Sequence, residues 1–114
     1  MCGKNEAIAI LNEVCEACNQ TFEHKIHDAF LYGSYARGDN HEWSDIDILL
    51  TVDISPEELR PYREAAASVC SDLGLEHDVM ISVLIEPLDQ FRRYSASLPY
   101  YRNVLREGIR YAAG

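Results

Sequence analysis

The sequence predicts an α/β fold of the α+β type, in which helices flank a small mixed β-sheet. Three observations lead to this prediction. Short apolar segments at 28–32, 45–52 and 77–85 have the length and composition of buried strands. Around them, apolar residues recur at steps of three and four, as on one face of a helix. The chain has 114 residues, which suits a single compact domain over 1–114.

The predicted helices have recognisable ends. Four ranges show helical periodicity or a proline at a helix start: 5–23, 55–74, 87–94 and 99–107. Ser55 and Glu58 have the spacing of a capping box, and Gly74 is expected to end the second helix. Strand, turn, strand, helix and strand follow one another, with helices at both ends. This order is typical of a small sheet covered by helices.

Charge and composition exclude several classes of protein. The chain has 19 Asp and Glu against 10 Lys and Arg, so its net charge is −9. Such a surface repels phosphate backbones, and we expect no binding of long nucleic acids. No apolar stretch is long enough to span a bilayer, and the first residues lack a secretory signal. The sequence therefore predicts a cytoplasmic protein with reduced cysteines and no membrane contact.

Paired carboxylates are the first sign of chemistry. Asp45 and Asp47 are separated by one residue on a predicted strand, so both project from one face, with Cα atoms about 6.6 Å apart. Two like charges at this distance favour a cation between them, and oxygen ligands favour Mg²⁺, with Mn²⁺ as an alternative. Asp78, predicted at the head of the third strand with the same phase, would complete a cluster of three catalytic and metal-binding acids.

A glycine turn offers the groups that phosphates need. Gly33 allows a tight turn after the first strand, and Ser34 supplies a hydroxyl and an N–H. The segment from Tyr35 to Gly38 would present further N–H groups, while Arg37 adds a planar positive charge. We therefore predict that Gly33, Ser34, Arg37 and Gly38 bind a nucleotide.

These residues resemble a known family. Gly33-Ser34 followed after ten residues by Asp45-Ile46-Asp47 is similar to the signature of the DNA polymerase beta-like nucleotidyltransferase superfamily. The closest resemblance is to its minimal branch, the MNT domains encoded beside HEPN proteins. Asp78 stands where that branch carries its third carboxylate, and the segment 98–108 resembles the closing helix. The resemblance implies Mg²⁺-dependent transfer of a nucleoside monophosphate, AMP from ATP, to a hydroxyl, with release of pyrophosphate.

The resemblance also implies a partner. In toxin–antitoxin pairs the accepting group is a tyrosine of the HEPN protein, so a HEPN-type partner is expected here. An alternative is an antitoxin that neutralises its partner by contact alone. A third is a nucleotidyltransferase acting on small molecules such as drugs, although those enzymes carry an extra helical domain. A domain this small leaves its pocket half open, which predicts a homo-oligomer or a heterocomplex.

Other residues have simpler interpretations. Cys15-x-x-Cys18 with His24 and His27 is too closely spaced for a zinc finger, and the cysteines are expected to act as small core residues. Tyr32, Tyr35 and Trp43 are expected to pack in the core or at its rim rather than to stack on a base, and His41 to be exposed and not catalytic. The roles of Tyr100 and Tyr101, in packing or at a partner surface, stay open.

Overall fold

The computed structural model describes residues 3–22, 25–41 and 44–111, and contains one four-stranded sheet of order β3-β2-β1-β4. Its elements are α1 (Lys4–Thr21), β1 (Ile26–Tyr32), α2 (Ser34–Arg37), β2 (Ile46–Val52), the 3₁₀ helix η1 (Pro56–Glu58), α3 (Leu59–His77), β3 (Ile81–Pro87), α4 (Leu88–Tyr94), α5 (Pro99–Glu107) and β4 (Ile109–Arg110). Strand β2 runs antiparallel to β1 and parallel to β3, and β4 runs antiparallel to β1. The sheet is therefore mixed, and the predicted fold class is confirmed.

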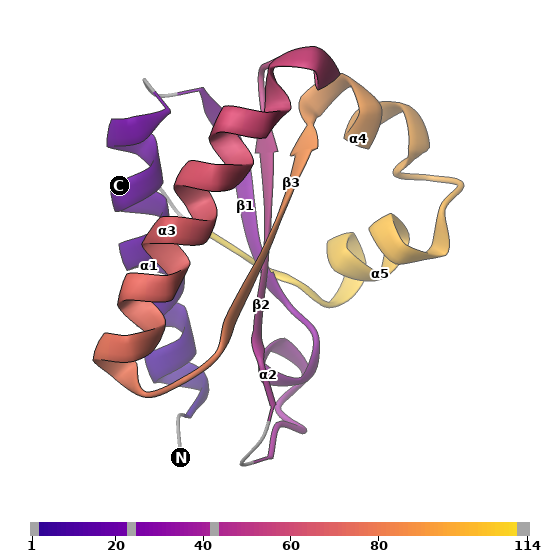
Figure 1. Cartoon of the computed structure of the whole chain (residues 1–114). Helices are drawn as coiled ribbons and strands as arrows, with labels where there is room; N and C mark the ends of the chain where they lie inside the picture. Colours follow the sequence, from indigo (N-terminus) through magenta and orange to yellow (C-terminus); the bar gives the residue numbers. More distant parts are fainter. Residues whose placement is uncertain (1–2, 23–24, 42–43, 112–114) are drawn as a thin grey trace.

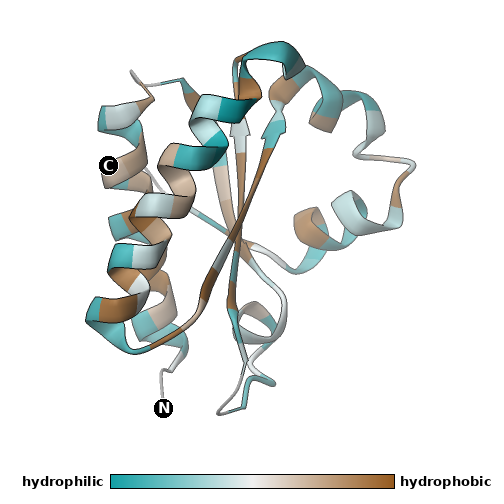
Figure 2. Cartoon of the chain, in the orientation of Figure 1, coloured by the Kyte–Doolittle hydropathy of each residue, from teal (hydrophilic) through white to brown (hydrophobic). Residues whose placement is uncertain are grey.

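Helices cover both faces of the sheet. Figure 1 shows α1 and α3 on one face, with α4 and α5 on the other. The alternation along β2 explains this arrangement, because Ile46 and Ile48 pack in the larger core with α1 and α3, while Leu49 packs with Phe91 and Tyr101 of the second helix layer. The strands accordingly show mostly hydrophobic colours in Figure 2, whereas the helices alternate between hydrophobic and hydrophilic residues.

The end of α3 differs from the prediction. Gly74 does not end the helix, which continues to His77 and is capped by Asp78 in the left-handed conformation, with φ 53° and ψ 50°. The carbonyl of Gly74 accepts the N–H of Val79 at 3.0 Å, and a Cβ at Gly74 would lie 2.7 Å from the Val79 carbonyl oxygen. The glycine is thus needed for the close return of the chain and not for helix termination.

One strand differs from its predicted range, and another was not predicted. Strand β3 begins at Ile81, so the prediction that Asp78 heads this strand is wrong, because the preceding residues close α3. Strand β4 has only two residues, Ile109 and Arg110, which is too short to show periodicity in the sequence. At the start of α3 the expected capping box is also wrong, since the Ser55 hydroxyl donates to the Glu58 carboxylate at 2.9 Å and no side chain caps the helix.

The remaining predicted elements are confirmed to within a few residues, including α1, α4 and α5. Among the described residues, none of the helices combines the length and the apolar character that crossing a bilayer requires.

Candidate active site

The turn after β1 is built around Gly33. Its backbone has φ +76° and ψ −155°, a region that essentially only glycine occupies. A Cβ at this position would overlap Oδ2 of Asp47 and lie 3.4 Å from its Cγ. The carbonyl of Gly33 accepts hydrogen bonds from the N–H groups of Ala36 and Arg37, each at 3.1 Å. Helix α2 therefore begins directly after the turn. The turn and the Asp47 carboxylate therefore lie in contact.

The two predicted acids lie at the start of β2, beside this turn. Asp45 is exposed just before the strand, and Asp47 is partly buried as its second residue. The alternation of the strand places the Asp47 side chain on the face of Leu49, which carries α4 and α5. Asp45 precedes the strand and lines a depression beside α3 and β3. Burial raises the pKa of Asp47, the charge of Asp45 raises it further, and Arg37 lowers it. A divalent cation would relieve this repulsion, so the pair fits the oxygen-rich site that Mg²⁺ or Mn²⁺ requires.

Asp78 lies apart from that pair. In the register of β2 and β3 it is Ser82, not Asp78, that stands beside Asp47. Asp78 precedes Ser82 by four residues and belongs to the end of α3. Among the described residues, Asp45, Asp47 and Asp78 do not form a group with ligand atoms all within 4.8 Å. The role of Asp78 as a third carboxylate therefore stays a prediction.

A groove nevertheless connects Asp78 to the site. It is an open depression of about 1060 Å³ along the end of α3 and the start of β3. Asp45 and Ser44 line its side next to β2, and Asp78 and Ser82 line it from α3 and β3. Asp78 and Asp45 thus line the same space.

Arg37, predicted to bind phosphate, is held by two carboxylates. Its Nε lies 3.1 Å from Oδ2 of Asp39, and its Nη1 lies 3.6 Å from Oε2 of Glu107 on α5. Its charge also reaches Asp47, as the lowering effect on the pKa of that carboxyl shows. Gly38 ends α2 with φ +82°. The structure therefore gathers the predicted nucleotide-binding residues at one end of the sheet, and their binding role stays a prediction.

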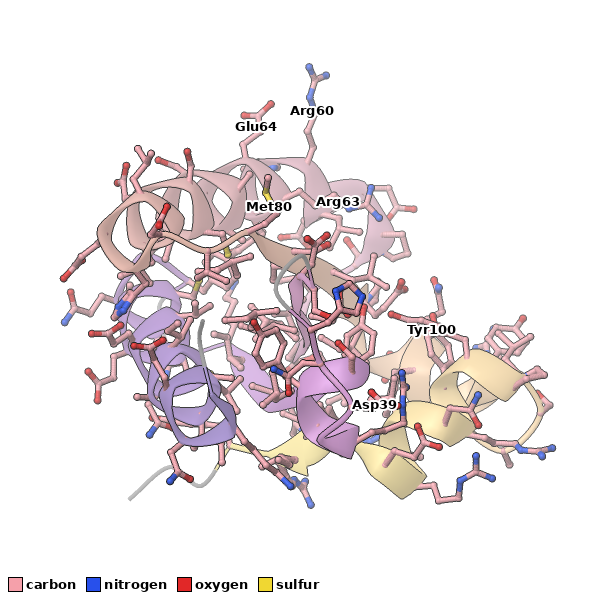
Figure 3. All side chains as sticks on the ribbon, turned by 90° about the horizontal axis from the view of Figure 1, so that it is seen from below. Asp39, Arg60, Arg63, Glu64, Met80 and Tyr100 are labelled. Atoms are coloured by element: carbon pink, nitrogen blue, oxygen red, sulfur yellow. The ribbon has the colours of Figure 1, made fainter. Side chains whose placement is uncertain are left out.

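A pair of tyrosines beside Asp47 was not predicted. Tyr32 stands next to Asp47 in the register of β1 and β2, and the Tyr100 hydroxyl donates to the Tyr32 hydroxyl at 2.5 Å. Burial, followed by hydrogen bonding to Tyr32, raises the pKa of Tyr100, and the charge of Asp47 adds to this effect. Figure 3 shows Tyr100 on the α5 side of the site and Met80 on the α3 side. No local signal reveals this pair, because 68 positions separate its members.

A second group of potential ligands lies in the α1–α3 layer. Glu13, Glu76 and His77 place their ligand atoms within 4.8 Å of one another, and His77 Nε2 lies 2.7 Å from Glu13 Oε2. None of the three lines the groove that Asp45 and Asp78 share, so they take no part in the site described above.

Comparison with known proteins identifies the family. The family model described as nucleotidyltransferase domain matches residues 11–111. The chain belongs to this nucleotidyltransferase family. The predicted resemblance and the prediction of an enzyme of this class are thus confirmed.

The nucleotidyltransferase domain has curated relatives in Methanocaldococcus jannaschii. One is 35% identical over 104 residues, covering 91% of this chain and 95% of the relative. Another is 32% identical over 80 residues, covering 70% of this chain and 79% of the relative. Both carry the name "putative protein adenylyltransferase".

Solved structures share the fold of this nucleotidyltransferase domain. A toxin–antitoxin structure with AMP-PNP aligns with a TM-score of 0.58 at 22% identity, covering 87% of this chain and 69% of that one. A mutant of the toxin–antitoxin MntA–HpeT aligns with a TM-score of 0.56 at 17% identity, with the same coverage. At this identity the likeness shows the fold alone.

The simpler interpretations hold where the structure describes them. Cys15 and Cys18 are buried in the core, as expected of small hydrophobic residues. Tyr35 and Tyr101 are buried as well, so both are packing residues. His24 and Trp43 lie outside the described residues.

Proposed function

We propose that this domain transfers AMP from ATP to a tyrosine hydroxyl of a partner protein of the HEPN type, with release of pyrophosphate. The observation that carries the proposal is the contact between the Gly33 turn and the Asp47 carboxylate, with Asp45 close enough for its charge to raise the pKa of Asp47. A turn that binds phosphates thereby lies next to a pair of acids that suits a divalent cation. The names of the curated relatives support protein as the acceptor.

Each residue has a distinct part in the proposed reaction. Gly33 and Ser34 bind the triphosphate, and Arg37 exchanges one of its carboxylate partners for a phosphate oxygen. Asp45 and Asp47 would hold Mg²⁺ or Mn²⁺, which supplies positive charge to the triphosphate and acidifies a bound hydroxyl. The tyrosine oxygen forms a bond to the α-phosphorus, and the bond between the α-phosphorus and the bridging oxygen breaks. Asp78, at the groove, is proposed to accept the hydroxyl proton.

A transfer assay tests the proposal. The chain is incubated with Mg²⁺, ATP labelled at the α-phosphate, and the purified product of the neighbouring gene. We expect labelled partner with the wild type and none with Asp47→Ala, while partner Tyr→Phe variants identify the acceptor. Transfer to a drug-like hydroxyl compound, with none to protein, would contradict the proposed acceptor.

The same variant separates catalysis from binding. An antitoxin that acts by contact would neutralise its partner equally well as wild type and as Asp47→Ala. Loss of neutralisation with Asp47→Ala, at unchanged affinity for the partner, is the result that the proposed enzyme requires.

A further inference from the structure

The order of the strands gives the site two sides. The Gly33 turn follows β1, the acid pair lies at the start of β2, and the groove described above lies at the start of β3. These strands are neighbours in the order β3-β2-β1. The acids therefore lie between the phosphate-binding turn and the groove. Since an in-line transfer needs the acceptor opposite the leaving pyrophosphate, the acceptor must approach from the groove side.

The groove is larger than one acceptor side chain needs. Its volume of about 1060 Å³ lies just above the range of about 300–1,000 Å³ that is usual for small-ligand sites. It also continues away from Asp45 along α3, past Ser71 and Gly74. A segment of chain around the acceptor would fill this space, whereas a single hydroxyl compound would leave most of it open.

The groove also carries apolar side chains that are uncovered. Leu75 is 83% exposed and Met80 is 66% exposed, which makes them the most exposed large hydrophobic side chains in the part of the chain that the structure describes. Both line the groove. Figure 3 shows Met80 on the side of the molecule that carries α3. A single exposed leucine is ordinary, but two such residues at one groove that leads to the catalytic acids favour an apolar ligand surface.

The charge of the groove selects among ligands. Asp45 and Asp78 line it, and none of the described residues that line it is Lys or Arg. An acidic lining repels a nucleic acid and attracts a cationic segment. Basic side chains next to the acceptor would pair with Asp78 without displacing the nucleotide.

We propose that this groove binds a polypeptide segment in which the acceptor tyrosine is flanked by apolar and basic residues. The proposal rests on the proposed function and adds the place and the chemistry of acceptor recognition. The apolar residues of the segment contact Leu75 and Met80, and a basic residue lies beside Asp78.

Short synthetic peptides test this recognition. The first probe has a central tyrosine flanked by leucines, with arginines towards its ends; in the second, glutamates replace the arginines; in the third, phenylalanine replaces the tyrosine. Fluorescence anisotropy measures the binding of each labelled peptide without added metal, and transfer of labelled AMP is measured with Mg²⁺ and ATP. The variants are Leu75→Ser with Met80→Ser, and, as a matched control, Leu105→Ser, which is 49% exposed on α5.

We expect the arginine peptide to bind and accept AMP better than the glutamate peptide. The double variant should weaken its binding about tenfold and raise the acceptor KM equally, with unchanged affinity for ATP, while Leu105→Ser leaves both values unchanged. The phenylalanine peptide should bind like the arginine peptide and accept nothing.

Several results would overturn the groove proposal. The first is that the arginine and glutamate peptides bind and accept AMP equally well. The second is that the double variant and Leu105→Ser lose peptide affinity equally. The third is that the wild type labels the partner protein but binds none of the peptides. Labelling of an added RNA oligonucleotide or of a second copy of the chain in place of peptide would also overturn it. Failure of the proposed function differs from all of these, because ATP then gives no labelled product with any acceptor, the partner included.

Discussion

Replacement of Gly33 by alanine tests the contact on which the site depends. The change demands that a residue with a side chain adopt φ +76° and ψ −155°, which costs about 1–3 kcal/mol of folding free energy. It also places a Cβ on Oδ2 of Asp47, so the carboxylate must move by roughly an ångström. A displacement of that size at a catalytic group lowers activity on the order of a hundredfold. We therefore expect a folded, weakened domain with almost no transfer.

Gly38→Ala is a control that strains the backbone without displacing the Asp47 carboxylate. Gly38 also has positive φ, at +82°, but a Cβ there meets no atom within 4 Å. This variant should lose about 1–2 kcal/mol of stability, with a much smaller loss of activity than Gly33→Ala. Urea denaturation gives the stability of both variants, and release of pyrophosphate from ATP gives their activity. If Gly33→Ala retained activity within about threefold of the wild type, the contact with Asp47 would not govern the reaction.

Three further predictions concern charge and burial. Mg²⁺ or Mn²⁺ with nucleotide should raise the melting temperature by roughly 4–6 °C at ten times the Kd, and Asp47→Asn should abolish the rise; unchanged melting at millimolar Mg²⁺ would count against the site. Burial alone would raise the pKa of Asp28, but hydrogen bonds from Arg110 and His27 lower it overall. The ionised carboxylate therefore stabilises the fold at pH values above its unfolded pKa of about 3.9. This stabilisation is lost as the pH falls through the lower pKa of the folded state. Urea denaturation of Asp28→Asn should therefore show a loss of stability at neutral pH that shrinks in acid, and an equal loss at both would refute this assignment. Burial raises the pKa of Cys15 to about 12, so with Cys2→Ser as background the native chain should react with iodoacetamide at least about a hundredfold more slowly than the urea-unfolded chain, and similar rates would contradict the buried core.

Periodicity made most of the fold predictable. The alternation along β2 predicted one wholly apolar face, and the proline at the start of α5 predicted where that helix begins. Such signals are local, because each depends on residues within a few positions of one another. Strand β4 has only two residues and is held by its pairing with β1, so its existence depends on residues nearly eighty positions away.

The parts of the site formed by residues close together in the sequence could be predicted. The parts that depend on how β2 and β3 pair could not. The Gly33 turn and the pair Asp45 and Asp47 could be predicted from spacing alone, because both signals depend on residues close together in the sequence. Which residue of β3 stands beside Asp47 depends on where α3 stops. The helix continues past Gly74 to His77, so β3 starts later than expected and Ser82, rather than Asp78, becomes the neighbour of Asp47.

The position of the acid pair depends on how far the helices α4 and α5 cover the strands. Phe30, Leu49 and Leu84 are neighbours across β1, β2 and β3 and pack in the cluster that Phe91 and Tyr101 complete. The next row towards α2 consists of Tyr32, Asp47 and Ser82, which are only partly buried or exposed.

A carboxylate in the buried row of Phe30, Leu49 and Leu84 would carry an uncompensated charge and unfold the domain. A carboxylate placed beyond the row of Asp47 would lose contact with the Gly33 turn. Asp47 occupies the first row in which water and a cation still have access, and the turn at Gly33 lies against that row. The same boundary leaves the β3 side of the site open, which is where the acceptor is proposed to enter.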